Sequence, residues 1–251
     1  MEELLNVRNL RKQYGEKLVV EDVSYVVNSG EIVGLIGPNG AGKSTMIKIL
    51  ADVEEKTDGE ILFHKASIAN QVKKYKSKLG IVPQDIAIYE DLSAYDNVKF
   101  FCSLYGYKKQ EVKERAQEAL EFVGLWERRK EMPGKFSGGM KRRLNIACSI
   151  AHSPELLIMD EPTVGIDPQS RNHIMESIKK LNAKGTTVIY VSHYMEEIEE
   201  ICNRIIIMDH GRILEDEAKD KFKEKYRAKN LNRLEDIFLY LTGTKLRDEE
   251  E

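Results

Sequence analysis

Gly37-Pro38-Asn39-Gly40-Ala41-Gly42-Lys43-Ser44 decides the fold of this chain, because it matches the pattern G-x-x-x-x-G-K-[ST] at every fixed position. Glycines let successive backbone N–H groups turn inward and form a concave site for phosphate oxygens. Glu31 to Gly37 is predicted to be a buried strand, and a helix is predicted to begin near Ser44. The helix N-terminus favours the same anion, so the sequence predicts a phosphate-binding loop between strand and helix.

Two residues at the end of this loop carry its charge and its metal-binding oxygen. Lys43 supplies a point charge for the β- and γ-phosphates, and the Ser44 hydroxyl is suited to binding Mg²⁺. We therefore expect ATP and Mg as ligands. The expected nucleotide-binding residues here are Gly37, Pro38, Asn39, Gly40, Ala41, Gly42, Lys43, Ser44 and Thr45.

A second apolar strand, Leu156 to Met159, ends in the acidic pair Asp160 and Glu161. Ligands of a parallel sheet bind at the carboxyl ends of its strands, where the phosphate loop also begins. Asp160 is therefore expected to hold Mg, directly or through water, and Glu161 to polarise the attacking water. Acid pairs at strand ends are often N-caps or solvated groups, and this assignment depends on the phosphate loop in the same chain.

His193 follows a further predicted strand, Thr187 to Ser192, and would lie at the same edge. It could contact the γ-phosphate there. A lone histidine at a strand end is usually structural, so this role also depends on the neighbouring motifs.

Short β-branched runs alternate with longer amphipathic stretches along most of the chain, which is typical of βαβ units. Leu4 to Leu10 and Val19 to Val27 instead predict an antiparallel pair, and the strand signal disappears from about Tyr89 to Ser153. The predicted fold class is α/β: a P-loop NTPase core of mainly parallel sheet, with an N-terminal antiparallel β layer and an inserted α-helical subdomain.

We expect a single domain over residues 1–251. Within it, the α/β core with its β layer would comprise residues 1–88 and 154–213. Residues 89–153 would form the helical subdomain, and residues 214–251 a C-terminal helical extension.

The composition indicates a soluble globular protein, since 41% of the residues are hydrophobic and 32% are charged. The net charge of −3 gives no basic excess, so we expect no nucleic-acid partner. Apolar runs are strand-sized, the N-terminus is acidic, and the three cysteines lie far apart. These features favour a reduced cytosolic protein without a secretory signal or membrane span.

Phe136-Ser137-Gly138-Gly139-Met140 resembles the signature motif of ABC ATPases and lies 23 positions before Asp160. In that family the motif closes on the γ-phosphate held by the partner subunit. The resemblance therefore implies a head-to-tail dimer with two sandwiched ATP molecules, and it adds Ser137, Gly138 and Gly139 to the nucleotide-binding residues. The common motif is Leu-Ser-Gly-Gly-Gln, so Phe136 and Met140 are departures from it.

Other family elements occur in the usual order. Tyr14 resembles the aromatic residue that stacks on adenine, and Gln84 the glutamine that contacts Mg and the attacking water. His193 resembles the switch histidine, and Gly165-Ile166-Asp167 the D-loop. The resemblance implies catalytic roles for Glu161, His193 and Gln84, and a metal site of Ser44, Gln84 and Asp160.

The variant motifs resemble the branch of drug, polysaccharide and sodium exporters. The implied function is an ATP-hydrolysing subunit that powers an ABC exporter through dimer closure against separate transmembrane permease subunits. The second ATPase subunit could be an identical copy or a relative. The implied location is cytoplasmic, on the inner face of the cell membrane, with the segment 86–107 docking the permease through Tyr89, Tyr95, Phe100 and Tyr105.

DNA-repair and chromosome-structure ATPases carry long coiled coils between the phosphate loop and the signature, and this chain has no sustained heptads there. A binding module without turnover is disfavoured by the intact acid pair. A non-transport ABC ATPase of the iron–sulfur assembly type remains the alternative.

Overall fold

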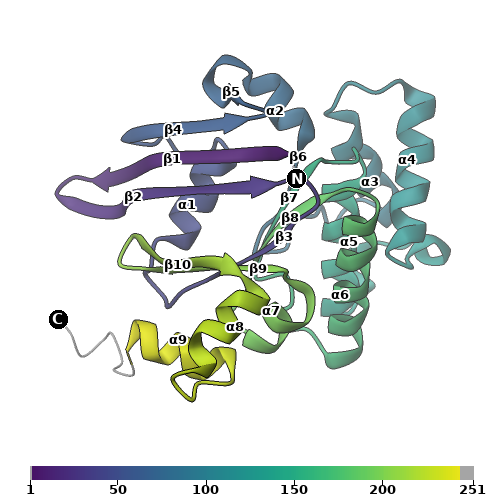
Figure 1. Ribbon diagram of the computed structural model, residues 1–251. Coiled ribbons are helices and arrows are strands. Elements are labelled where there is room, and N and C mark those ends of the chain that lie inside the picture. The colour runs from purple at the N-terminus through teal and green to yellow at the C-terminus, as the bar shows by residue number, and fades with distance from the viewer. Residues whose placement is uncertain (1, 244–251) are drawn as a thin grey trace. The chain divides into compact units, whose positions relative to one another are not determined.

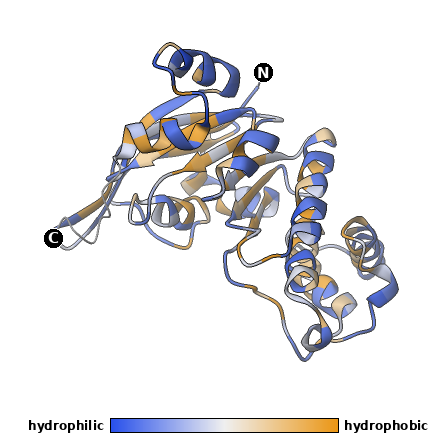
Figure 2. Ribbon diagram, turned by 90° about the horizontal axis from the view of Figure 1, so that it is seen from below, coloured by the Kyte–Doolittle hydropathy of each residue, from blue (hydrophilic) through white to orange (hydrophobic). Residues whose placement is uncertain are grey.

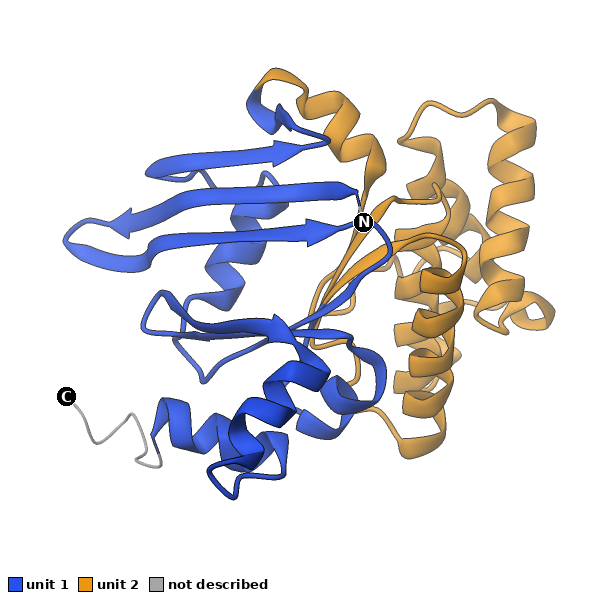
Figure 3. Cartoon of the chain, in the orientation of Figure 1, with its two compact units in different colours: residues 1–69, 190–251 blue, residues 70–189 orange. Residues whose placement is uncertain are grey.

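The computed structural model describes residues 2–243, which divide into two compact units (Figure 3). Unit 1 comprises residues 1–69 and 190–251, and unit 2 comprises residues 70–189. The chain passes from unit 2 into unit 1 within strand β8 (Thr187–Val191), which is entirely buried. The last part of the expected C-terminal extension, residues 244–251, lies outside the described residues, as does Met1.

Unit 1 contains the antiparallel layer that the sequence predicts (Figure 1). Strand β1 (Glu3–Tyr14) pairs antiparallel with β2 (Lys17–Asn28) on one side and with β4 (Asp58–Phe63) on the other. A short strand, β5 (Ala66–Ser67), pairs with β4 and gives the order β2-β1-β4-β5. Strands β4 and β5 were not predicted from the sequence.

The second group of strands in unit 1 positions the phosphate loop. Strand β3 (Ile32–Ile36) is buried along its whole length and runs parallel to β9 (Arg204–Asp209). Strand β10 (Arg212–Ala218) pairs antiparallel with β9 at the edge. Figure 2 shows the strands as the most continuously hydrophobic segments, whereas the helices alternate between hydrophilic and hydrophobic residues.

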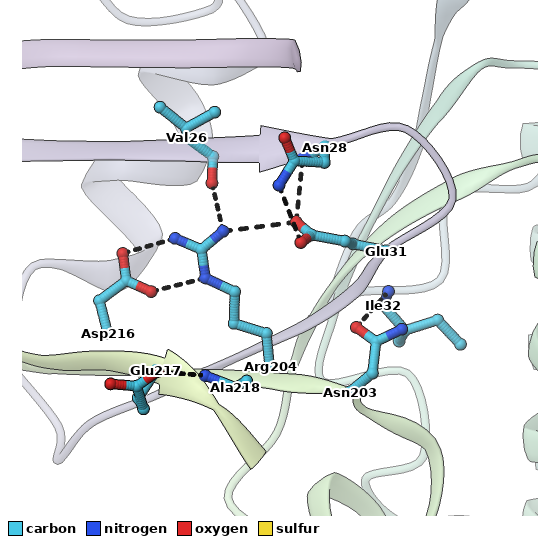
Figure 4. A network of polar contacts seen from close by, with 9 residues as sticks. All are labelled: Val26, Asn28, Glu31, Ile32, Asn203, Arg204, Asp216, Glu217 and Ala218. Carbon is cyan, nitrogen blue, oxygen red and sulfur yellow. Dashed lines mark hydrogen bonds and ion pairs between the residues drawn. The ribbon is translucent and has the colours of Figure 1, made fainter. Parts of the chain in front are cut away.

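Arg204, at the start of β9, ties three strands of unit 1 together (Figure 4). Its guanidinium donates to both carboxylate oxygens of Asp216, at 2.6 and 2.7 Å, and to the carbonyl of Val26 at 2.6 Å. It also lies 3.4 Å from Glu31, whose carboxylate accepts from the backbone and side chain of Asn28. This network fixes the start of β3, and therefore the strand that enters the phosphate loop.

The C-terminal segment is helical only in part. The sequence predicted helix from Leu214, which is wrong for residues 214–218 because they form most of β10 and pair with β9. The charged side chains of this edge strand have partners, since Asp216 binds Arg204 and Glu215 binds Lys225. The helices of unit 1 are α1 (Lys43–Leu50), α7 (Met195–Ile201), α8 (Lys219–Arg227) and α9 (Leu234–Thr242).

Unit 2 contains the predicted helical insertion. Strand β6 (Leu79–Val82) pairs parallel with β7 (Leu156–Asp160), and the stretch between them, which is fully described, holds helices and no strand. Ser93 caps the first of these helices by accepting from the Asp96 backbone N–H at 3.1 Å, as the sequence predicts. The α-helices are α2 (Val72–Lys78), α3 (Ala94–Ser103), α4 (Lys109–Phe122), α5 (Gly138–Ile150) and α6 (Pro168–Ala183), with 3₁₀ turns η2 (Trp126–Arg128) and η3 (Pro133–Lys135). A further 3₁₀ turn, η1 (Ile68–Asn70), lies where the chain passes from unit 1 into unit 2.

Within residues 2–243, no helix has both the length and the apolar character that crossing a membrane requires.

Candidate nucleotide-binding and hydrolysis site

The phosphate loop, residues 37–44, connects β3 to α1 in unit 1, as the sequence predicts. Gly40 and Gly42 have φ angles of 76° and 100°, which lie in the left-handed region that glycine enters without strain. A Cβ at Gly37 would lie 2.2 Å from the Met208 carbonyl oxygen. The loop therefore needs glycine both for its turns and for its close approach to β9.

Lys43 is buried, with 6% of its surface exposed, although it carries a charge. Its Nζ donates to the carbonyl oxygens of Gly37 at 2.7 Å and Pro38 at 3.0 Å. The ammonium is thus folded against the loop from which α1 begins. Ser44 is exposed and Thr45 half-buried in the first turn of that helix. A buried cation and a helix N-terminus at one loop fit a polyphosphate anion.

Tyr14 ends β1 and is 44% exposed. The Lys12 ammonium lies 4.6 Å from the centre of its ring, and the same ammonium is 2.6 Å from Glu54. An exposed aromatic face of this kind can take a stacking partner. Its predicted role in adenine binding fits this exposure and remains a prediction.

His193 is exposed two residues after the end of β8, and a buried carboxylate holds the residues beside it. Glu197, on α7, accepts hydrogen bonds from the Ser192 and Tyr190 hydroxyls, each at 2.8 Å. The Ser192 oxygen in turn accepts from the Tyr194 N–H at 3.0 Å. The residues on both sides of His193 are therefore fixed, which the sequence analysis did not foresee.

In unit 2, Asp160 ends β7 and Glu161 follows it, both half-buried. Glu161 has a φ of 46°, which is uncommon for a residue with a side chain and is found preferentially at functional sites. The next residues turn tightly, since the Ile166 N–H donates to the Thr163 carbonyl at 3.1 Å. The turn redirects the chain immediately after the acid pair.

Gln84 lies two residues beyond the end of β6, and its side chain is exposed. Its backbone carbonyl accepts from the Arg142 guanidinium at 2.5 Å, and the Pro83 carbonyl accepts from the same group at 2.7 Å. Arg142 belongs to α5 and is 3% exposed. No motif in the sequence singles out Arg142.

The signature motif forms the N-terminus of α5. Ser137 is the N-cap, and its hydroxyl accepts from the Met140 N–H at 3.3 Å. Ser137 and Gly138 are exposed, whereas Gly139 is buried against the start of α6. Asp167 of the predicted D-loop caps α6 by accepting from the Ser170 N–H at 2.9 Å. This hydrogen bond lowers the pKa of the Asp167 carboxyl.

The two unusual signature residues share one neighbour. Phe136 is buried and lies 5.5 Å beneath the Arg128 guanidinium. A nitrogen of the same guanidinium is 3.2 Å from the Met140 sulfur, and Glu131 pairs with Arg128 at 2.8 Å. Phe136 and Met140, which stand in place of the common leucine and glutamine, therefore pack against the ion pair of Arg128 and Glu131.

The predicted site residues are divided between the two units. Unit 1 holds Tyr14, the phosphate loop and His193, and unit 2 holds Gln84, the signature residues, Asp160 and Glu161. The predicted Mg ligands, Ser44, Gln84 and Asp160, all offer oxygen atoms, which is the donor type that Mg²⁺ prefers. In residues 2–243, no cluster of three or more His, Cys, Asp or Glu side chains is arranged to hold a metal.

Comparison with known proteins shows the family of this chain. Residues 20–164 match the family described as "ABC transporter". The linearmycin resistance ATP-binding protein LnrL of Bacillus subtilis (strain 168) is 52% identical over 211 residues, which cover 84% of this chain and 68% of the relative. The Nod factor export ATP-binding protein I of Cupriavidus metallidurans (strain ATCC 43123 / DSM 2839 / NBRC 102507 / CH34) is 37% identical over 212 residues, 84% of this chain and 70% of the relative.

Among solved structures, the chain resembles a dimeric ATP-binding cassette, MJ0796, in a post-hydrolysis state bound to ADP and Pi. The TM-score is 0.77 at 28% identity, and the match covers 86% of this chain and 98% of that one. The chain therefore belongs to the ABC transporter family, as one of its ATP-binding, ATP-hydrolysing subunits.

Proposed function

We propose that this subunit powers an ABC exporter by ATP-driven closure of a dimer of ATPase subunits against separate membrane subunits. The observation that carries the proposal is the buried Lys43 within a glycine loop that leads into α1. The names of the two relatives, one in linearmycin resistance and one in Nod factor export, support the export direction.

In this proposal the phosphate loop grips the triphosphate tail of ATP. The phosphate loop binds the β- and γ-phosphates through its N–H groups, and Lys43 moves from the Gly37 and Pro38 carbonyls to the phosphate oxygens. The exposed ring of Tyr14 stacks on adenine.

Hydrolysis needs positioning and charge neutralisation more than covalent chemistry. Glu161 orients the attacking water and accepts its proton. His193 and Gln84 complete the site around the γ-phosphate. Ser44, Asp160 and Gln84 would hold Mg²⁺, which neutralises phosphate charge when bound.

The signature residues act on the nucleotide of the second subunit. Ser137 and Gly138 are exposed at the N-terminus of a 13-residue helix, where backbone N–H groups favour an anion. Closure on the γ-phosphate then links ATP binding to dimer formation. The second subunit is either an identical chain or a relative.

Membrane subunits would dock on the aromatic cluster of unit 2. Of the four predicted contacts, Tyr89 and Phe100 are 49% and 39% exposed, and their rings meet edge to face at 5.0 Å. Tyr95 and Tyr105 are half-buried, and Tyr105 stacks on His152 at 3.7 Å. We therefore assign docking to Tyr89 and Phe100, which would place the subunit on the cytoplasmic face of the membrane.

The experiment is co-purification from detergent-solubilised membranes, followed by transport in inside-out vesicles. We expect a multi-span protein to co-purify with the wild type and not with Tyr89→Ala/Phe100→Ala, whose soluble ATP binding is retained. Vesicles should accumulate substrate only with hydrolysable ATP. Co-purification of soluble iron–sulfur assembly proteins instead would overturn the transport role. Loss of substrate from the vesicles on addition of ATP would overturn the export direction.

A further inference from the structure

Helix α5 and the turn that follows it carry polar side chains that contact the backbone of β6. The Ser149 hydroxyl donates to the Ile81 carbonyl at 2.6 Å, and His152 Nε2 lies 3.0 Å from the Leu79 carbonyl. Arg142 continues this series to the carbonyls of Pro83 and Gln84. Arg142 and Ser149 lie seven residues apart on one face of α5, and His152 follows in the turn after the helix, so these three side chains hold the segment 79–84.

Arg142 differs from the other two because it acts beyond the end of the strand. The paired register of β6 and β7 ends at Val82 and Met159, and Pro83 and Gln84 come after it. Two nitrogens of one planar guanidinium bind these successive carbonyls, at 2.7 and 2.5 Å. A buried, two-pronged contact of this kind fixes both position and orientation of the backbone.

The same helix begins at the signature motif. Ser137 precedes Arg142 by five residues, or about 7.5 Å along the helix axis. A displacement of the Ser137 end of α5 therefore carries the Arg142 guanidinium with it, together with the carbonyls that it holds.

We propose that Arg142 is a positioning residue for Gln84. It sets the backbone from which the Gln84 side chain reaches Mg²⁺ and the attacking water, and it couples that side chain to closure of the signature helix. This inference rests on the proposed role of Gln84 in hydrolysis. Arg142 itself does not touch the nucleotide.

The test compares Arg142→Met and Arg142→Lys with Ser149→Ala, which removes a hydrogen bond from the same helix to β6 three residues before Gln84. We expect Arg142→Met to lower kcat about 10- to 100-fold and to raise the Mg²⁺ concentration for half-maximal turnover, while ATP affinity by calorimetry changes less than about twofold. Arg142→Lys should recover part of kcat, and Ser149→Ala should keep it near the wild-type value.

Folding is checked by thermal unfolding of every variant. If Arg142→Met does not fold, Arg142→Lys carries the test, with a smaller kcat loss and the same unchanged ATP affinity. A folded Arg142 variant with wild-type kcat and Mg²⁺ dependence would overturn the inference. An equal loss of ATP affinity and turnover would also overturn the inference, because it indicates general disruption of unit 2.

Gln84→Ala and the double variant with Arg142→Met separate this inference from the proposed function. We expect the double variant to be no slower than Gln84→Ala alone, because both changes remove the same interaction. Wild-type turnover in Gln84→Ala would reject the proposed role of Gln84. If Gln84→Ala is slow and the double variant is slower still, with a kcat loss equal to the product of the two single losses, only the positioning role is rejected.

Discussion

Gly139 lies directly against Ser170: a Cβ placed on Gly139 would be 2.1 Å from the Ser170 Oγ and 2.5 Å from its Cβ. The second glycine of the signature motif therefore serves packing between the starts of α5 and α6. A Cβ placed on the preceding residue, Gly138, would have no neighbouring heavy atom within 4 Å. The two adjacent glycines thus have different physical requirements.

We predict that Gly139→Ala lowers the free energy of unfolding by about 1–3 kcal/mol through overpacking. Gly138→Ala is the matched control and should change it by less than about 0.5 kcal/mol. Urea unfolding measures both. Gly139→Ala/Ser170→Gly should recover most of the loss, and equal stability of the two single variants would contradict the packing role.

Lys43→Ala removes the cation expected to bind the β- and γ-phosphates. A hydrogen bond to a charged group contributes about 1.5–3 kcal/mol, so ATP affinity should fall about 10- to 100-fold. Lys48→Ala, an exposed lysine on the same helix, is the control. Calorimetry with unhydrolysed ATP checks the result, and unchanged affinity in Lys43→Ala would count against the phosphate loop as the binding site.

Burial lowers the pKa of His152 to about 4, a shift that the nearby Arg115 reinforces and the hydrogen bond to the Leu79 carbonyl opposes. The unfolded chain, whose histidine pKa is about 6.5, therefore binds a proton that the folded chain does not. The contribution of neutral His152 to the free energy of unfolding is complete above about pH 6.5. It is lost as the pH falls toward 4, by up to about 1.4 kcal/mol per pH unit. His152→Gln should flatten this dependence in urea unfolding between pH 7 and 5, and an identical slope would refute it.

Glu197 accepts two hydrogen bonds from buried or nearly buried hydroxyls beside His193. Glu197→Ala leaves the Tyr190 and Ser192 hydroxyls without this acceptor, so we expect a loss of about 2–3 kcal/mol in stability and a lower kcat. Glu196→Ala, at an exposed neighbouring position, should match the wild type in both. Unaltered unfolding of Glu197→Ala would show that the network does not hold this segment.

Most of the structural features that could be predicted from the sequence were predicted from short local motifs. The phosphate loop, the acid pair and the capping of α3 by Ser93 depend on local residue order, and the structure has the expected strand, loop and helix at each. Strand β4 was missed because Asp58, Gly59 and Glu60 give it a weak strand pattern, although it pairs with β1.

The contacts between distant segments could not be predicted in the same way. Arg142 and the carbonyls of Pro83 and Gln84 are 58 or more residues apart, so only packing of α5 on β6 reveals their relationship. A signal was present in the sequence, because Arg142 and Ser149 lie seven residues apart, which places them on one face of the helix. Strand β10 was misread because ion pairs satisfy its charged side chains.

The most direct test of the account is phosphate release from MgATP by Glu161→Gln, with Glu155→Gln as the control one residue before the start of the same strand. We predict that Glu161→Gln binds ATP, loses about 10²- to 10⁴-fold in turnover and elutes as an ATP-dependent dimer, while Glu155→Gln hydrolyses normally. Phosphate release at the wild-type rate by Glu161→Gln would contradict the central claim.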